Sequence, residues 1–372
     1  MIGLGRKGSP PELPDELARE LEAAPASLAD SVAAATSGSS LQEGILHDTT
    51  ALPLHHGGRL DELRIAWRLT GKPGLPLVVA LGGISGGRRV WTGAPATREA
   101  RAQRGWWEEI VGPGRALDSE RCRILGFDYL GGSGETTGPA RGQDDFPSVS
   151  AYDQAEVLRR LLEHLALPAP QAIVGASYGG MVALAFAQRW PERARRIVVI
   201  SAADRPHPMS TAWRSVQRAI VRFAVQQGEG PEGLRLARAL AMATYRSADE
   251  FAERFGGLPE RHEGRFRFPV ESYLLARGDA YAQSFVPEAF VCLSESIDLH
   301  RVDPAQIRTP ATLVAVREDQ LVPLADMRAL QARLAGPAEL IEISSRYGHD
   351  AFLKEAEALR PLFTRVVRGA QS

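Results

Sequence analysis

The chain has 372 residues, of which 44% are hydrophobic and 24% are charged, close to the average of soluble globular proteins. Its 44 basic residues nearly balance 45 acidic residues, so a dedicated nucleic-acid-binding protein is disfavoured. One compact core rarely exceeds about 250 to 300 residues, so we expect segments outside a single core.

The two cysteines, Cys122 and Cys292, form no metal-type cluster in the sequence. The N-terminus carries no secretory signal, so we expect reduced, packed thiols and a cytoplasmic protein. No apolar run approaches the roughly 20 residues that a membrane span needs, so we expect no membrane association.

The first 45 residues differ in character from the rest of the chain. They contain the runs GRKGSPPELP and AAPASLADSVAAATSGSS, which are rich in proline or in small residues. This composition predicts an N-terminal tail over residues 1–45. A mobile terminus and an arm that covers a partner subunit are the two alternatives for it.

From about residue 60 onward, short apolar runs alternate with amphipathic stretches such as residues 150–167 and 181–194. Nearly continuous apolar strands followed by helices are typical of covered parallel sheets, so we expect an α/β fold with a mostly parallel, doubly wound sheet. The predicted strands, in chain order, are Leu63–Leu69, Leu77–Leu81, Arg123–Asp128, Ala172–Gly175, Arg196–Ser201, Thr312–Val316 and Leu340–Ile343.

The alternation stops over residues 202–303, where amphipathic helices follow one another without a convincing strand. Predicted helices cover residues 215–227, 233–247 and 271–285. A segment of this length is too long for a simple connection, so we expect a helical lid inserted into the core. The core then comprises residues 46–201 and 304–372.

A short motif between a predicted strand and a helix carries the clearest chemical signal. It reads Gly175-Ala176-Ser177-Tyr178-Gly179 and follows the apolar run AIV. This context predicts a nucleophile elbow, in which Ser177 projects from a tight turn and the Tyr178 N–H helps to stabilise an oxyanion. The alternative is a turn without catalytic function.

A serine nucleophile needs a base and an orienting carboxylate, which follow it in chain order in this type of fold. His349 lies in the loop after the predicted strand LIEI and is the predicted base; a solvent-exposed loop histidine is the alternative. Two acids, Glu318 and Asp319, follow the strand TLVAV. We favour Asp319, because the residues after it resemble the D-x-x-x-P loop that follows this strand in many hydrolases with a nucleophile elbow.

The loop after the strand LVVAL reads GGISGGRR and contains Gly82 and Gly83. Such a glycine-rich loop is predicted to supply the second oxyanion N–H from the Gly82 to Gly83 region. It lacks the GK[ST] ending of a phosphate-binding loop. The next residues, Arg88 and Arg89, either hold an anionic substrate group or are solvated.

Further motifs resemble one family of enzymes. The segment GWWEEIVGPG, residues 105–114, looks like a block of the homoserine O-acetyltransferase and O-succinyltransferase family, which has the α/β-hydrolase fold. The resemblance runs from about residue 60 to the end of the chain. The other matching segments are Asp118, LGG at 130–132, TGP at 137–139, GGM at 179–181, GLRLAR at 233–238, TYRS at 244–247, VESYL at 270–274 and GHDAFL at 348–353.

The resemblance implies acyl transfer from a coenzyme A thioester to the hydroxyl group of an amino acid, in methionine or cysteine synthesis. Ser177 would be the acylated nucleophile, His349 the base and Asp319 its partner, in a ping-pong mechanism. Acyl-CoA would be a substrate, and we expect no bound cofactor and no metal.

The resemblance also implies residues that bind the acceptor. Arg238 would hold its carboxylate, Asp350 would hold its ammonium group, and Tyr245 would line the site. Two opposite charges suit an amino acid, because a buried site must neutralise both of its charged groups. The family usually forms homodimers through lid helices, so we expect the same here.

Three alternatives remain at this stage. The donor is succinyl-CoA or acetyl-CoA, and we lean slightly to succinyl because Arg88 or Arg89 could meet a distal carboxylate. The acceptor is homoserine or serine. The same triad would also serve an esterase or thioesterase.

Overall fold

The computed structural model describes residues 41–92 and 104–368. Eight strands form one sheet in the order β1-β4-β8-β5-β9-β10-β13-β14. The five pairings from β8 to β14 are parallel, whereas β4 is antiparallel to both β1 and β8. The predicted doubly wound, mostly parallel α/β sheet is therefore confirmed. The strands are β1 (Gln42–Asp48), β4 (Leu63–Thr70), β5 (Leu77–Leu81), β8 (Arg123–Phe127), β9 (Ala172–Ala176), β10 (Ile197–Ile200), β13 (Ala311–Val316) and β14 (Ala338–Ile343).

Helices cover both faces of this sheet, so its central strands are buried from end to end. Alternate residues point to opposite faces: Val79 packs with helices α3, α4 and α10, whereas Val78 packs with α12 and the segment around Trp107. These helices are α3 (Ala151–His164), α4 (Tyr178–Arg189), α10 (Leu324–Arg333) and α12 (Ala356–Arg368). The short elements are β2 (Leu52–Pro53), β3 (Arg59–Leu60), β6 (Val111–Gly112), β7 (Leu117–Asp118), η1 (Pro304–Gln306), η2 (Gly348–Asp350) and α11 (Ala351–Lys354).

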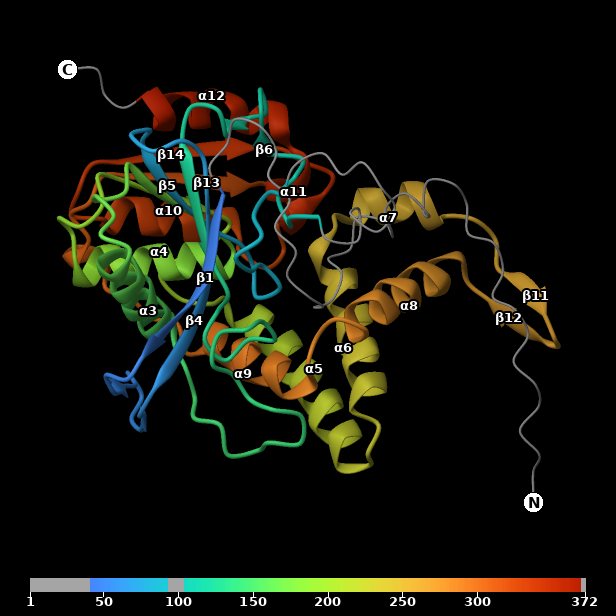
Figure 1. Ribbon diagram of the computed structural model, residues 1–372. Helices are drawn as coiled ribbons and strands as arrows, with labels where there is room; N and C mark the ends of the chain where they lie inside the picture. Colours follow the sequence, from blue (N-terminus) through green and yellow to red (C-terminus); the bar gives the residue numbers. More distant parts are fainter. Residues whose placement is uncertain (1–40, 93–103, 369–372) are drawn as a thin grey trace.

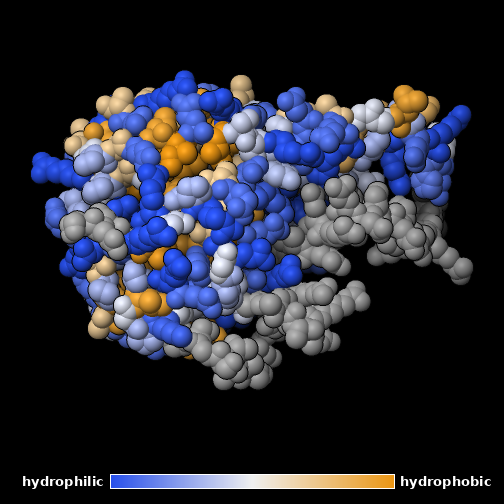
Figure 2. Space-filling model, turned by 90° about the horizontal axis from the view of Figure 1, so that it is seen from above, coloured by the Kyte–Doolittle hydropathy of each residue, from blue (hydrophilic) through white to orange (hydrophobic). Residues whose placement is uncertain are grey.

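The segment between β10 and β13 forms a helical lid, part of which projects away from the sheet (Figure 1). Figure 2 shows the molecule from above, with mostly hydrophilic side chains on this face of the projecting part. The elements of the lid are α5 (Pro208–Gln226), α6 (Gly230–Tyr245), α7 (Ala248–Phe255), β11 (Glu260–His262), β12 (Arg265–Arg267), α8 (Pro269–Ala282) and α9 (Pro287–Asp298). The three predicted helices correspond to α5, α6 and α8, whereas α7 and α9 were not predicted.

The lid also contains a β-hairpin, β11–β12, although no strand was expected there. Its six residues are all exposed, so they carry no alternation of apolar and polar residues. The signal lies in the turn, where Glu263 and Gly264 both have positive φ angles of 48° and 80°. Two consecutive positive φ angles are the signature of a tight two-residue hairpin loop.

The core begins earlier than the sequence indicates. Strand β1 starts at Gln42 and pairs with β4 along its whole length, so the predicted boundary at residue 45 divides a strand of the sheet. The reason is that β1 is an edge strand in which only Leu46 is buried, which leaves little hydrophobic pattern. Residues 1–40 of the predicted tail lie outside the described residues.

Both cysteines are buried free thiols, and burial raises the pKa of each to about 12. Within residues 41–92 and 104–368, no helix is both long and apolar enough to cross a bilayer. The same residues contain no group of three or more side chains suited to hold a metal ion.

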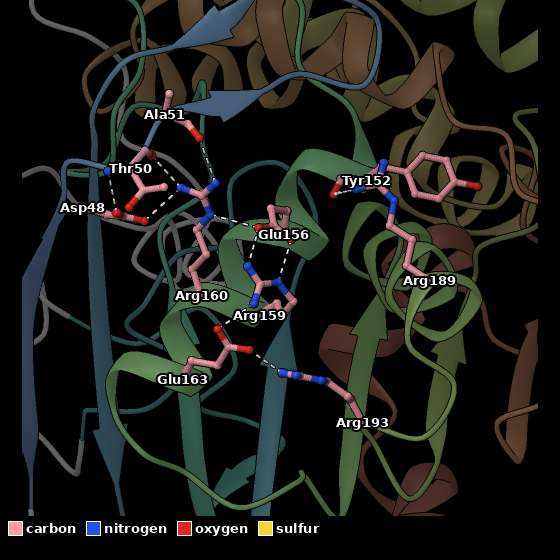
Figure 3. A network of polar contacts seen from close by, with 10 residues as sticks. All are labelled: Asp48, Thr50, Ala51, Tyr152, Glu156, Arg159, Arg160, Glu163, Arg189 and Arg193. Carbon is pink, nitrogen blue, oxygen red and sulfur yellow. Dashed lines mark hydrogen bonds and ion pairs between the residues drawn. The ribbon is translucent and has the colours of Figure 1, made fainter.

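A network of charged side chains attaches the end of β1 to helix α3 (Figure 3). Arg160 bonds to the Asp48 carboxylate at 2.9 Å and to the backbone carbonyls of Thr50 and Ala51 at 2.8 and 3.1 Å. Its Nε donates to Glu156 at 3.0 Å. One guanidinium thus satisfies several polar groups of the segment that follows β1.

Replacing Arg160 with Met should lower the free energy of unfolding by about 2 kcal/mol, because the partly buried Ala51 carbonyl loses its donor and the Asp48 carboxylate keeps only Thr50 as a donor. The matched control is Arg159→Met on the same helix. Its partners Glu156 and Glu163 also pair with Arg160 and Arg193, so its effect should stay below about 1 kcal/mol. Urea denaturation of both variants measures this difference, and equal losses would contradict it.

Candidate active site

Ser177 lies at a tight turn between β9 and α4 and has φ and ψ angles of 53° and −121°. The turn depends on its two flanking glycines. A Cβ at Gly175 would lie 2.1 Å from the Gly179 carbonyl oxygen, and a Cβ at Gly179 would lie 2.3 Å from the Leu81 carbonyl oxygen. No side chain fits at such distances, so the motif is a steric requirement of the turn.

The structure brings the three predicted triad residues together. His349 Nε2 lies 2.9 Å from Ser177 Oγ, and His349 Nδ1 lies 2.7 Å from Asp319 Oδ2. The other oxygen of Asp319 accepts the N–H groups of Leu321 and Val322 at 2.8 and 3.0 Å. This carboxylate is therefore fixed in the orientation that holds the imidazole toward the serine.

The alternative acid, Glu318, points elsewhere. Its carboxylate accepts hydrogen bonds from the Ser344 hydroxyl and from the Ser345 N–H. It therefore fastens the strand end of β13 to the residues after β14. This arrangement favours Asp319 as the partner of His349.

His349 is buried, which by itself would lower the pKa of its imidazole. The charge and the hydrogen bond of Asp319 outweigh burial and hold the pKa of His349 above its ordinary value. Asp350 acts in the same direction, and Arg214 opposes it. The base is thus strengthened by its own carboxylate partner.

The glycine-rich loop after β5 also lies next to Ser177. The Gly82 carbonyl accepts the Gly179 N–H at 2.8 Å and the Tyr129 hydroxyl at 2.7 Å. In a trans peptide the next N–H points the opposite way, so the Gly83 N–H is directed away from these two donors. A Cβ on Gly83 would lie 4.0 Å from Ser177 Cβ. Gly83 and Tyr178, the first residue of α4, are therefore the candidate oxyanion donors, and Gly82 supplies a carbonyl that fixes the loop.

Two tryptophans connect this loop to the loop of the base. The Trp106 ring packs on Gly82, where an added Cβ would lie 3.1 Å from the ring, and its N–H donates to the Gly87 carbonyl at 3.0 Å. Trp107 stacks on Trp106 with ring centroids 4.9 Å apart and donates to the Phe352 carbonyl at 2.8 Å. Phe352 lies three residues after His349, so one aromatic pair supports both sides of the site.

The predicted acceptor residues lie near the base. The Tyr245 ring centroid is 5.7 Å from that of His349, and the Arg238 guanidinium lies 5.2 Å from the centre of the Tyr245 ring. Asp350 is buried beside His349 and forms an ion pair with Arg246 at 3.2 Å. The sequence did not single out Arg246. The structure thus places an aromatic ring and a carboxylate beside the imidazole, with the Arg238 cation packed against the Tyr245 and Tyr281 rings.

Arg88 and Arg89 lie away from the triad. They line a cavity of about 150 Å³ whose walls include neither Ser177 nor His349. The three nitrogens of Arg88 pair with the carboxylates of Glu43, Asp128 and Glu135, so its charge is compensated inside the protein. Arg89 is half-buried and 3.9 Å from the Glu43 carboxylate. We therefore do not assign Arg88 to substrate binding, contrary to the expectation from its place in the sequence.

A separate cavity of about 50 Å³ opens directly onto Ser177 and His349. Its walls combine the oxyanion loop at Ile84, the start of α4 at Met181, and lid residues from α5 and α9. Arg214 on α5 is a cation in this wall, as is Arg205, which precedes α5. The sequence did not single out Arg214, because the predicted helix begins at residue 215; in the observed α5, Arg214 and Arg218 stand four residues apart, the spacing that places two side chains on one face.

Comparison with known proteins finds consistent matches. Residues 76–356 match a family model described as the alpha/beta hydrolase fold, so the chain belongs to that fold family. A homoserine O-succinyltransferase from Xanthomonas campestris pv. campestris is 40% identical over 317 residues, which cover 85% of this chain and 82% of that protein. A homoserine O-acetyltransferase from Clavibacter michiganensis is 32% identical over 84% of this chain and 90% of that protein. A serine O-succinyltransferase from Litchfieldella anticariensis is 33% identical over 83% and 94%.

Solved structures agree on the fold. The homoserine O-acetyltransferase from Bacillus anthracis superposes with a TM-score of 0.79 at 15% identity, covering 91% of this chain and all of that one. Esterase E22 superposes with a TM-score of 0.75 at 17% identity, over 87% of this chain. Transferases and hydrolases therefore share this architecture, and the fold by itself does not separate them.

The raised pKa of His349 sets the expected pH dependence. The imidazole must be neutral to accept a proton, so kcat/KM should rise with pH and reach half its plateau above pH 6.5, the ordinary pKa of histidine. Replacing Asp319 with Asn should move this midpoint downward, because it removes the charge that raises the pKa, and should lower kcat by about 10³- to 10⁴-fold. A pH–rate profile of both proteins tests this; an unchanged midpoint in the Asn variant would contradict the assigned pairing.

Proposed function

Because the chain belongs to the homoserine O-acyltransferases of the α/β-hydrolase fold, and is therefore an acyltransferase, we propose that it transfers an acyl group from acyl-CoA to homoserine. The observation that carries the proposal is the site itself. A hydrogen-bonded Ser177-His349-Asp319 series lies beside the Asp350 carboxylate and the Tyr245 ring, and the Arg238 cation packs on that ring. A zwitterionic acceptor needs both charges, whereas a neutral ester needs neither.

In the first half of the proposed reaction, Ser177 Oγ attacks the thioester carbonyl carbon and its proton passes to His349 Nε2. The N–H groups of Gly83 and Tyr178 stabilise the resulting oxyanion. The carbon–sulfur bond then breaks, and coenzyme A leaves with the proton that His349 returns. The product is an acyl ester on Ser177.

In the second half, the acceptor hydroxyl attacks the acyl ester and gives its proton to His349. Arg238 holds the acceptor carboxylate, and Asp350, which shares its charge with Arg246, holds the ammonium group. The ester bond to Ser177 breaks and the serine regains its proton from His349. The lid that closes the cavity limits access of water, which favours transfer over hydrolysis.

Succinyl-CoA is the donor that we propose, with acetyl-CoA as the alternative. The 40% identity to a protein named homoserine O-succinyltransferase supports this choice. Serine is the alternative acceptor, supported by the relative named serine O-succinyltransferase. We place the reaction in methionine biosynthesis in the cytoplasm, with which the buried, reduced thiols agree. Coenzyme A thioesters enter as substrates, and the scheme uses no bound cofactor.

A matrix of two donors and two acceptors should separate these functions. We expect O-succinylhomoserine from succinyl-CoA and homoserine, and a burst of free thiol with a succinyl adduct on Ser177 when the acceptor is omitted. Mass spectrometry of the product and of the protein measures both. The Ser177→Ala variant serves as the control and should show neither. Free acid as the only product with every acceptor would instead identify a hydrolase.

We also propose that the protein forms a homodimer through the lid. Helices α5 and α6 expose several large apolar side chains in the single chain, which is unusual for a surface that faces only water. They are Met209, Val216, Phe223 and Leu236.

Phe223 is 68% exposed and provides the test of the dimer. The wild-type protein should sediment as a dimer, and Phe223→Glu should sediment as a monomer, because a buried carboxylate without a partner opposes association. The control is Phe266→Glu at the exposed hairpin, which should remain dimeric. A monomeric wild-type protein would contradict the proposal.

A further inference from the structure

The lid carries a largely buried cluster of two arginines and one aspartate, one member of which, Arg214, lines the cavity that contains the nucleophile. On helix α5, Arg214 donates to Asp298 Oδ1 through Nε at 2.8 Å and through Nη2 at 2.6 Å. Arg218, one turn further, donates to Asp298 Oδ2 at 2.6 Å. All three side chains are at most 12% exposed. Two cations share one carboxylate, so the cluster has an excess positive charge.

The guanidinium groups of the two arginines differ in how many hydrogen-bond partners they have. Arg218 also donates to the Ser294 carbonyl and hydroxyl at 3.0 Å and to the Ser215 hydroxyl at 3.3 Å. Arg214 uses Nε and Nη2 on Asp298, and its Nη1 has no hydrogen-bond partner among the described residues. The excess charge is therefore available on Arg214.

Arg214 faces the reacting centre. It lines the cavity of about 50 Å³ that also contains Ser177 and His349, and its charge lowers the pKa of His349 from across this space. One turn earlier on α5, the Ser210 hydroxyl donates to the Leu321 carbonyl at 2.7 Å. Leu321 lies two residues after Asp319, so α5 is fastened to the loop that carries the triad carboxylate.

A second polar group in the same cavity lacks a partner. Ser201, at the end of β10, is 1% exposed, and its Oγ has no hydrogen bond to any described residue. Its φ angle of 51° is unusual for a residue with a side chain. A buried hydroxyl without a partner is unfavourable unless a ligand or water completes it. The cavity that contains Ser177 is thus lined by a cation and a hydroxyl group that each have an unused hydrogen-bonding atom.

The other charged groups around the cavity do not cancel the positive charge of Arg214. Asp326 is the one carboxylate among the described residues that line it, and Arg205 is a second lining cation, at 53% side-chain exposure and 3.5 Å from Asp204. The lining therefore has a net positive charge, with His349 neutral. An occupant that carries a carboxylate fits this charge, and a neutral acetyl group does not use it.

We propose that Arg214, assisted by Ser201, binds the terminal carboxylate of a dicarboxylic acyl group carried on Ser177. The inference rests on the proposed acyl-enzyme and names its acyl class, which is a succinyl-like chain. The distal carboxylate of such a chain, attached to Ser177 Oγ, lies only about 5 Å from that oxygen when extended. In this arrangement, selectivity for the donor comes from the lid helix α5 and not from Arg88.

The test uses two nitrophenyl esters that acylate the enzyme without coenzyme A or an acceptor. p-Nitrophenyl hemisuccinate and p-nitrophenyl butyrate have acyl chains of the same length and differ in the terminal carboxylate. The wild-type protein should acylate faster with the hemisuccinate. Arg214→Met should lose about 10- to 150-fold in this rate, the range for a hydrogen bond to a charged group, with the butyrate rate within about threefold of wild type.

Three further variants make the result interpretable. Arg214→Lys should restore part of the hemisuccinate rate, because it keeps a cation, and Ser201→Ala should show a smaller loss confined to the hemisuccinate. Arg222→Met changes an exposed arginine of the same helix and should leave both rates unchanged. Thermal unfolding checks that Arg214→Met stays folded, as expected because Asp298 keeps its pair with Arg218.

The outcomes separate this inference from the proposed function. Equal losses with both esters in Arg214→Met would overturn the inference and give Arg214 a role only in joining α5 to α9. A rise in KM for homoserine with unchanged hemisuccinate acylation would also overturn it, because Arg214 would then bind the acceptor. A selective loss of hemisuccinate acylation supports it, even if the donor and acceptor matrix yields only free acid and the transferase proposal fails.

Discussion

The close approach of three backbone segments at Ser177 is the constraint on which the site depends. Strand β9 must turn into α4 so tightly that Gly175 and Gly179 nearly touch, and α4 must begin directly against the end of β5 at Leu81. The same contact fixes the oxyanion loop, because the Gly179 N–H holds the Gly82 carbonyl. The same backbone contacts therefore position the nucleophile and the oxyanion donors before any substrate is bound.

Around this rigid centre, the lid contributes charge. Arg214, Arg218, Arg246 and Asp298 are mostly removed from water, and such burial costs more than an exposed ion pair gains. Apolar side chains of similar size would fill the same space at a lower desolvation cost. In the proposed function these arginines serve recognition, since polar groups fixed beside the nucleophile can discriminate between acyl chains and acceptors.

The sequence was sufficient for the parts of the protein that obey local rules. Apolar runs predict the central strands because these are buried on both faces, and the turn motif predicts Ser177 because its glycines are sterically required. Edge strand β1 and hairpin β11–β12 could not be predicted, because their mostly exposed residues show no alternation of apolar and polar side chains. Arg88 and Arg214 show that the sequence also does not reveal which arginines reach the site. Proximity along the chain suggested Arg88, but tertiary contacts engage it with three carboxylates and leave Arg214 facing the cavity.

The tryptophan pair has a consequence for exchanging loops between relatives. This chain has Gly-Gly-Ile-Ser-Gly at residues 82–86, so a loop transplanted from a relative with any other residue at position 82 would bring a side chain there. A Cβ there meets the Trp106 ring at 3.1 Å, and that ring is clamped by Trp107 against the carbonyl of Phe352. The loop, the indole stack and the segment after the catalytic histidine thus pack against one another as a unit. A chimaera in which only one of these three parts is exchanged would have a steric clash at the reactive centre.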